Sequence, residues 1–186
     1  SAVTRKHGFE TEIIDATVYD SDYNKTSEKI ISSSPDYVGI TAAAIAIDNA
    51  DQLARLIKSK MGNITIIVGG PHITAVPDET MERYPSIDIG VIGEGEITII
   101  ELLTALEEER SLREIKGIIY REGNHLFLTP TREYISHLDE LPYPAWDLLP
   151  EIKRWYCPPV HTIKSLPAMC LVTSRGCTGQ CTFCDR

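Results

Sequence analysis

Three cysteines near the end of the chain have the spacing of a metal site. Cys177, Cys181 and Cys184 follow the pattern C-x3-C-x2-C, so one short loop could direct three thiolates toward a single point. Thiolates are soft ligands that favour iron–sulfur clusters, zinc or copper(I). In a four-iron cluster, three protein ligands leave one iron free to bind a small molecule. The loop therefore predicts a metal centre with an open coordination position.

Zinc is the competing interpretation of this loop, with a fourth ligand from Cys157, Cys170 or His161. Structural zinc sites usually pair C-x2-C units or combine them with histidines, and the spacing of this loop departs from that pattern. We therefore favour a four-iron, four-sulfur cluster and assign no ligand role to Cys157 or Cys170. Because nothing follows Arg186 to bury a cluster, we expect the cysteines of this chain alone to be free or oxidised.

The composition bounds the class of protein. With 186 residues, of which 42% are hydrophobic, the chain has room for one domain with a buried core and an appendage. Its net charge of −9 argues against a nucleic-acid partner, since phosphate contacts need clustered Lys and Arg. We see no apolar stretch long enough for a membrane helix. All five cysteines lie after residue 156, unlike a secreted disulfide framework, so we expect a cytoplasmic protein.

Upstream of the cysteines, short apolar segments alternate with amphipathic ones. The predicted strands are 9–15, 37–41, 64–68 and 87–92, and the predicted helices are 26–33, 48–61, 77–84 and 96–110. This alternation predicts βαβ units in an α/β domain with a doubly wound, flavodoxin-like open parallel sheet. The chain opens in the last turns of a helix that Gly8 ends, so we expect an earlier strand to precede Ser1.

We divide the chain into three parts. Residues 1–128 form the α/β domain, with a small hairpin of 118–121 and 125–128 at its end. Residues 129–168 hold seven of the eleven prolines and both tryptophans, which indicates an extended connector that lies against a surface. Residues 169–186 form a last strand, 169–173, and the cysteine loop.

Three predicted strand ends carry small residues. Ligands of open α/β sheets bind outside the carboxyl ends of the strands, where backbone N–H groups and helix N-termini are accessible. The candidate ligand contacts at these ends are Thr41, Ala42, Ala43, Gly69, Gly70, Pro71, His72, Gly93 and Glu94. The alternative is that the glycines only form the turns between strands and helices, and the spacing leaves both interpretations open.

Two of these strand ends resemble motifs of the cobalamin-binding fold. Thr41-Ala42-Ala43 and Gly69-Gly70 are similar to that family's S-x-L and G-G motifs, which line the channel for the nucleotide tail of the cofactor. Thr41 keeps the hydroxyl of the serine, whereas Ala43 lacks the bulk of the leucine. A third family motif, D-x-H-x-x-G, supplies the histidine that replaces the base beneath cobalt. It would precede Ser1, and His7-Gly8 is not that motif, since no aspartate precedes it at the right spacing.

Four phrases extend the resemblance along the chain. They are IVGGPHIT (67–74), IGEGEIT (92–98), LDELPYPAWDLLP (138–150) and TSRGCTGQCTFCDR (173–186). In that order they resemble cobalamin-binding radical S-adenosylmethionine proteins, particularly the anaerobic magnesium-protoporphyrin monomethyl ester oxidative cyclases. The resemblance covers essentially the whole chain.

The resemblance implies a chemistry for the cysteine loop. Cys177, Cys181 and Cys184 would hold a four-iron, four-sulfur cluster, and the methionine part of S-adenosylmethionine would bind its open iron. Phe183 would shield the cluster or contact adenine. Reductive cleavage would give a 5′-deoxyadenosyl radical that abstracts hydrogen from an unreactive carbon. Residues 169–186 would be the start of a catalytic barrel that this chain lacks, so the chain itself would hold no catalytic residue.

We therefore expect a cobalamin-binding domain with the first loop of its own catalytic barrel, cut from a radical enzyme. The longer enzyme would act on a small molecule, such as a tetrapyrrole, by methyl transfer to carbon or by oxidative cyclisation. The rival hypothesis is a flavodoxin-like domain that has lost cobalamin and presents substrate to the barrel or binds a partner. Thr41 and Ala43, which replace the usual serine and leucine, are the residues that favour the rival.

Overall fold

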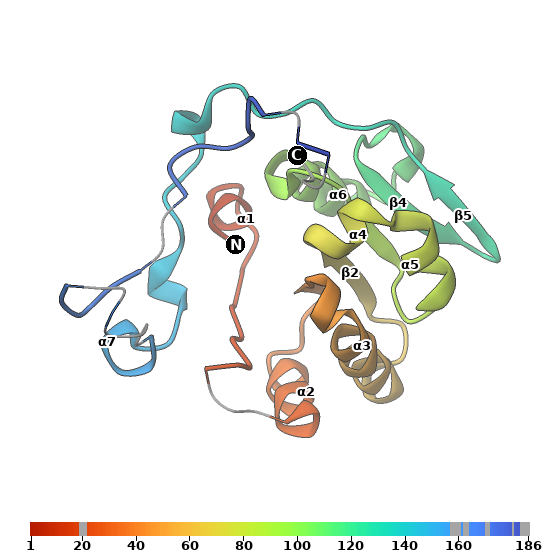
Figure 1. The fold of residues 1–186 in the computed structure, drawn as a ribbon. Helices are drawn as coiled ribbons and strands as arrows, with labels where there is room; N and C mark the ends of the chain where they lie inside the picture. Colours follow the sequence, from red (N-terminus) through yellow and green to blue (C-terminus); the bar gives the residue numbers. More distant parts are fainter. Residues whose placement is uncertain (19–21, 157–160, 162–163, 170–171, 180, 183–186) are drawn as a thin grey trace. The chain divides into compact units, whose positions relative to one another are not determined.

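A computed structural model describes residues 1–18, 22–156, 161, 164–169, 172–179 and 181–182 of the chain (Figure 1). The chain divides into two compact units, 1–148 and 149–186. The described residues of the first unit form a five-stranded sheet and six α-helices, and those of the second form one short helix.

The strands are β1 (Tyr37–Thr41), β2 (Thr65–Gly69), β3 (Ile89–Val91), β4 (Ile118–Glu122) and β5 (His125–Leu128). The helices are α1 (Ala2–Lys6), α2 (Tyr23–Ser32), α3 (Ile47–Met61), α4 (Pro71–Ala75), α5 (Pro77–Arg83), α6 (Gly95–Glu107) and α7 (Ile152–Trp155). Short 3-10 turns cover Ala44–Ala46, Leu112–Glu114, Leu138–Glu140 and Trp146–Leu148.

The sheet has the order β1-β2-β3-β4-β5. β1 pairs with β2 and β2 with β3 in parallel, and an αβ connection joins each pair. β3–β4 and β4–β5 are antiparallel. The expected α/β fold is therefore confirmed, and the predicted hairpin forms as β4 and β5. The hairpin continues the sheet, which makes the sheet mixed.

Helices cover both faces of the sheet. Along β2, Ile66 and Val68 belong to one core cluster and Ile67 to the other, as the alternation of side chains in a strand requires. The first cluster includes Ala54 and Ile57 of α3 together with side chains of α2, α4 and α5. The second is built around Leu102 of α6. β2 is buried on both faces, which explains its nearly continuous apolar sequence TIIVG.

The predicted strand at residues 9–15 is wrong. These residues form no ladder with any strand, and among the described strands β1 pairs only with β2. Phe9 packs partly against the second core cluster and Ile14 against the first. The apolar side chains therefore find packing partners, but the backbone has no neighbouring strand beside it, and a strand needs one.

The predicted strand at 169–173 is also not observed in the described residues. Met169, Val172 and Thr173 belong to no strand, and Cys170 and Leu171 lie outside the described residues. Met169 and Val172 are exposed. Taken by itself, the second unit offers these residues no sheet partner in its described part, so their β propensity is not realised.

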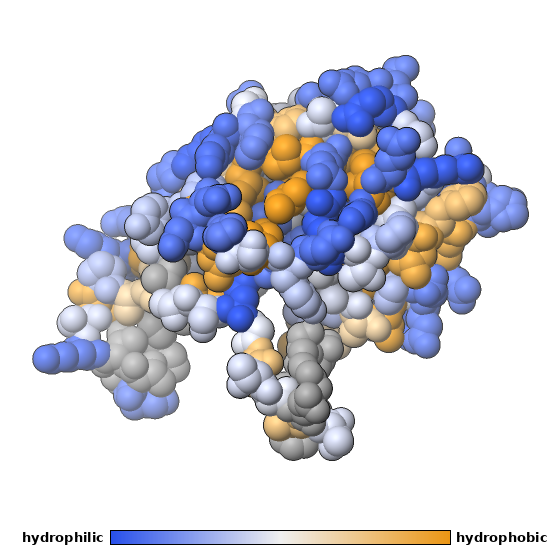
Figure 2. Space-filling view, turned by 90° about the horizontal axis from the view of Figure 1, so that it is seen from above, coloured by the Kyte–Doolittle hydropathy of each residue, from blue (hydrophilic) through white to orange (hydrophobic). Residues whose placement is uncertain are grey.

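The surface mixes apolar and charged residues. Figure 2 shows apolar groups in the middle of one face, bordered by hydrophilic ones. No helix in the described part of the chain has the length and apolar character to cross a membrane. The most exposed large apolar side chains of the first unit are Ile45, Tyr143, Tyr134 and Leu128.

Candidate functional site

The ends of β1 and β2 stay joined beyond the strands themselves. Thr41 is in register with Gly69, the last residue of β2. The N–H of Ala42 donates to the carbonyl of Gly69 at 2.9 Å, and the N–H of His72 donates to the carbonyl of Ala42 at 3.3 Å. The backbones of the two predicted motifs, Thr41–Ala43 and Gly69–His72, therefore lie side by side at the carboxyl edge.

Gly70 is the point of closest approach. Its φ of +104° lies in a region that residues with a side chain rarely adopt. A Cβ at this position would lie 2.9 Å from both the carbonyl oxygen of Ala42 and the hydroxyl oxygen of Thr41. The backbone conformation and the close contact both require glycine, so the Gly-Gly pair does more than make a turn.

Thr74 links the third strand end to the first two. Its hydroxyl donates to the carbonyl of Gly70 at 2.9 Å and accepts the N–H of Gly93 at 3.1 Å. Gly93 lies two residues after the end of β3 and has a φ of +73°. Sequence reasoning missed Thr74. The available signal was a threonine four residues after Gly70, since threonine hydroxyls bond the carbonyl four residues back in a helical turn.

The carboxyl edge presents small residues and one large apolar side chain. Ala42 is buried, whereas Thr41, Ala43 and Pro71 are exposed. Ile45, in the 3-10 turn after β1, is 96% exposed. Sequence reasoning also missed Ile45, which stands as the one bulky residue in a run of alanines. We refer to the three strand ends and this turn as the cofactor edge.

Glu94 belongs to the start of α6 but its carboxylate faces the connector. The residue is the N-cap of α6, and its backbone is extended. Its Oε2 accepts the N–H of Ile135 at 2.6 Å. The side chain therefore serves a contact within the first unit, and its role as a cofactor contact stays a prediction.

Residues 129–148, named the strap below, are fastened to the helices of the first unit. The Nε of Arg132 donates to the hydroxyl of Thr98 at 2.8 Å, and its Nη1 donates to Glu101 at 3.1 Å. The Arg132 side chain is only 12% exposed. Near the other end of the strap, Arg5 of α1 pairs with Asp147. The first half of the predicted connector is thus part of the compact first unit.

The charged partners of the strap shift the pKa of two exposed carboxyls. Hydrogen bonding from the Arg5 guanidinium holds the pKa of Asp147 below its usual range. A hydrogen bond from Lys116 does the same for the pKa of Glu133. Both shifts favour the ionised form. The strap is therefore held in part by contacts that need charged carboxylates.

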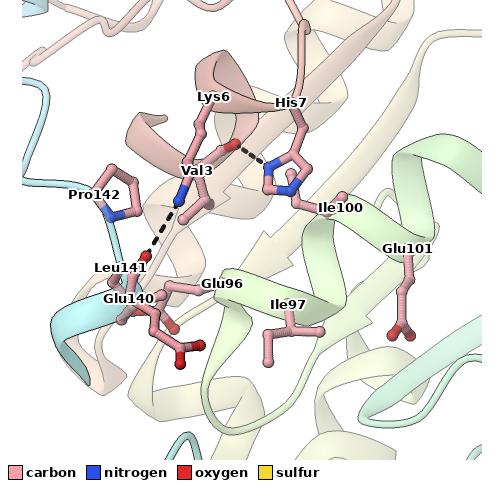
Figure 3. Close-up of a pocket in the computed structure, with 10 residues that line it drawn as sticks. All are labelled: Val3, Lys6, His7, Glu96, Ile97, Ile100, Glu101, Glu140, Leu141 and Pro142. Atoms are coloured by element: carbon pink, nitrogen blue, oxygen red, sulfur yellow. Dashed lines mark hydrogen bonds between the residues drawn. The ribbon is translucent and has the colours of Figure 1, made fainter. Parts of the chain in front are cut away.

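A pocket lies between α1, α6 and the strap (Figure 3). The Nζ of Lys6 donates to the carbonyl of Glu140 at 3.2 Å across one side of it. The remaining lining residues are Val3, His7, Glu96, Ile97, Ile100, Glu101, Leu141 and Pro142. The pocket does not include any of the predicted ligand contacts, so we do not place the cofactor there.

In the second unit, two of the three predicted cluster ligands can be placed. Cys177 and Cys181 are exposed free thiols. A Cβ on Gly179 would lie 3.3 Å from the sulfur of Cys177 and 3.7 Å from that of Cys181, so both sulfurs border one point. The N–H of Gly179 donates to the sulfur of Cys177 at 3.3 Å. Accessible thiols that converge in this way suit an iron–sulfur cluster, whose potential depends on such bonds.

Cys184 and Phe183 lie outside the described residues, and so do Cys157 and Cys170. In the part of the chain that the structure describes, no three histidines, cysteines, aspartates or glutamates come together as a metal site. The complete three-cysteine set is therefore not tested by the structure, and the cluster stays a prediction.

The fold and the strand ends define a class of protein: an α/β domain in which backbone and small residues line the carboxyl ends of the parallel strands. Residues 1–103 match the B12 binding domain family, and the chain belongs to that family.

Relatives agree with this assignment. The chain is 37% identical over its whole length to the uncharacterized methyltransferase PH0819 of Pyrococcus horikoshii, of which it covers 38%. It is 30% identical over 97% of its length to the anaerobic magnesium-protoporphyrin IX monomethyl ester cyclase of Rubrivivax gelatinosus, of which it covers 33%. The chain thus spans about a third of the length of these relatives.

A solved structure shows the same fold with ligands. The cobalamin-dependent S-adenosylmethionine radical enzyme OxsB, with aqua-cobalamin and S-adenosylmethionine bound, superposes with a TM-score of 0.69 at 28% identity. The match covers 80% of this chain and 21% of that one. The predicted family, a cobalamin-binding domain related to radical S-adenosylmethionine enzymes, is confirmed.

Proposed function

We propose that this chain binds cobalamin at the cofactor edge and is part of a radical S-adenosylmethionine enzyme. The observation that carries the proposal is the contact of Gly70 with Thr41 and Ala42, which leaves no room for a side chain. At this approach, only backbone atoms separate the two strand ends. Ligands of open α/β sheets bind at this edge, and membership of the B12 binding domain family names the ligand.

The residues of the edge have separate tasks in this proposal. Gly69 and Gly70 let an extended part of the ligand lie against the backbone, and the exposed Thr41 offers a hydroxyl for a hydrogen bond. Burial of the Ile45 side chain against an apolar ligand surface would favour binding, since nearly the whole side chain faces solvent in the chain alone. The remaining proposed contacts are Ala42, Ala43, Pro71, His72, Gly93 and Glu94.

Cobalamin, when bound, supplies a cobalt centre that carries methyl groups or takes part in electron transfer. The chain's own contribution is to bind and orient the cofactor. We propose that the edge residues only bind the cofactor, and we assign them no chemical step. We propose that the chain alone is inactive.

Cys177, Cys181 and Cys184 are the proposed ligands of a four-iron, four-sulfur cluster in the longer enzyme. The convergence of the first two sulfurs beside Gly179 supports this set. The cluster would supply the binding site for S-adenosylmethionine, and Phe183 would cover the cluster. Stable binding of one zinc ion per chain, with no iron after anaerobic reconstitution, would contradict the assignment.

The substrate of the longer enzyme is a small molecule with an unactivated carbon. The names of the relatives support two outcomes, methyl transfer and oxidative cyclisation of a tetrapyrrole. The residues of this chain do not choose between them, because the substrate would bind in the catalytic barrel. The net charge of −9 and the late cysteines support a cytoplasmic enzyme without a nucleic-acid partner.

Titration with hydroxocobalamin tests the proposal. We expect the absorbance spectrum of the cofactor to change on addition of the chain, and the cofactor to migrate with the chain in gel filtration. If the spectrum stays that of free hydroxocobalamin and the two separate at high micromolar concentration, the cobalamin-free interaction module is the better account. The Ile45→Ser variant sharpens the result, because an exposed residue can be changed without loss of the fold.

A further inference from the structure

A series of direct contacts crosses the cofactor edge and ends on the strap. Gly70 bonds to the hydroxyl of Thr74, and the same hydroxyl accepts the N–H of Gly93. The next residue, Glu94, accepts the N–H of Ile135 in the strap. Each link is a hydrogen bond or a peptide bond, so the edge and the strap are connected without a gap.

We propose that Thr74 and Glu94 are positioning residues that fasten the strap to the cofactor edge, so that the two parts respond to each other. The identity of the ligand in this inference rests on the proposed function, whereas the mechanical coupling does not. Neither residue needs to touch the reacting atoms. Their role is to hold the strap in a fixed position relative to the cofactor edge.

The geometry gives each link a physical basis. Glu94 stands directly before α6, so the start of that helix fixes its backbone. A carboxylate that accepts a backbone N–H makes a charge-assisted bond, which is stronger than one between neutral groups. Arg132 holds the preceding part of the strap to Thr98 and Glu101 of the same helix. The strap therefore cannot shift near Ile135 without disturbing the start of α6.

The coupling has a consequence for the longer enzyme. The strap continues through Leu149 into the segment that carries Cys177 and Cys181. A ligand that orders the cofactor edge would also order the strap, and a strap held in place would favour the ligand by the same factor. Ligand binding at the cofactor edge would thus change the order of the chain segment that leads to the cysteine loop.

Amide hydrogen exchange at Ile135 tests the coupling without any cofactor. Thr74→Val removes the hydroxyl but keeps the shape, and Thr74 itself donates nothing to the strap. We expect the Ile135 amide to exchange about two- to tenfold faster in this variant, the range that one hydrogen bond is worth. Thr65→Val is the matched control at the opposite end of β2 and should leave Ile135 unchanged. Equal Ile135 exchange in wild type and Thr74→Val overturns the inference.

A second set of variants checks that Glu94 is the last link. Glu94→Ala should speed exchange at Ile135, and Glu94→Gln, which keeps an acceptor oxygen, should restore part of the protection. With hydroxocobalamin at a concentration that absorbance titration shows to saturate both proteins, exchange at Ile135 should slow in wild type but not in Glu94→Ala. A similar slowing in both proteins contradicts the coupling. If hydroxocobalamin does not bind at all, the proposed function fails, while the Thr74→Val comparison still decides the coupling.

Discussion

The cofactor edge and the cysteine loop differ in what builds them. At the edge, tertiary contacts set the position of each group: Gly70 abuts β1, and Thr74 joins the loops after β2 and β3. In the cysteine loop, Cys177 and Cys181 converge beside Gly179 through local chain geometry, and both are exposed. The edge is therefore a preorganised surface, whereas the loop needs further structure around it to protect a cluster.

The largest expected effect separates the two sites. In the longer enzyme, Cys181→Ala should prevent assembly of the cluster, because two thiolates remain of the three. Anaerobic reconstitution followed by iron analysis measures this, with about four irons per chain expected in wild type. Cys157→Ala is the control and should keep the full iron content. Full iron content in Cys181→Ala would remove that cysteine from the ligand set.

The next effect concerns the packing of the edge. Gly70→Ala should lower the free energy of unfolding by at least about 1–2 kcal/mol, because a side chain at positive φ adds strain to the contact with Ala42. Hydroxocobalamin affinity should fall by at least tenfold. Gly39→Ala is the matched control in β1, since a Cβ there meets nothing within 4 Å. Chemical denaturation and absorbance titration check both values, and equal behaviour of the two variants would refute the role of Gly70.

A smaller effect tests the apolar part of the edge. Ile45→Ser should weaken hydroxocobalamin binding by a few-fold, because it removes a side chain that we expect the ligand to bury. Its stability should match that of wild type, as the residue is exposed in the chain alone. Leu128→Ser, an exposed leucine in β5, provides the control. An unchanged affinity of Ile45→Ser for hydroxocobalamin would show that the Ile45 side chain does not contribute to binding.

The smallest effect comes from the charges of the strap. The pKa values of Asp147 and Glu133 are lowered in the folded chain, so their contribution is present above the unfolded carboxyl pKa near 4 and is lost as pH falls below it. We expect faster amide exchange in residues 129–148 at pH 3 than at pH 6, after correction for intrinsic rates. Asp147→Asn should reduce this dependence. An unchanged pH dependence in Asp147→Asn would show that the Arg5 pair does not hold the strap.

The sequence predicted the sheet well where periodicity alone decides the structure. β1, β2 and β3 and helices α3 and α6 lie within a few residues of their predicted ranges, because apolar runs and amphipathic periods mark buried strands and helices. The segment 9–15 has a strand-like pattern too, but a strand also needs a neighbour. No local pattern reports whether that neighbour is present.

The site was predicted in part for the same reason. Cys177 and Cys181 are recognisable from spacing, and Gly70 from its place after a strand. The bond between Thr74 and Gly93 and the exposure of Ile45 could not be assigned, since both depend on how distant strand ends meet. The contact of Glu94 with Ile135 joins residues far apart in the sequence, so only the fold reveals it.

We propose above all that cobalamin binds at the carboxyl edge of β1, β2 and β3. Two-dimensional NMR of the labelled chain with hydroxocobalamin tests it most directly. We predict that the largest shift changes fall on the amides of residues 41–45, 69–74 and 93–95, while those of the hairpin 118–128 stay nearly constant. Shift changes confined to the pocket between α1 and α6, or to the second unit, would contradict the claim, as would none at all.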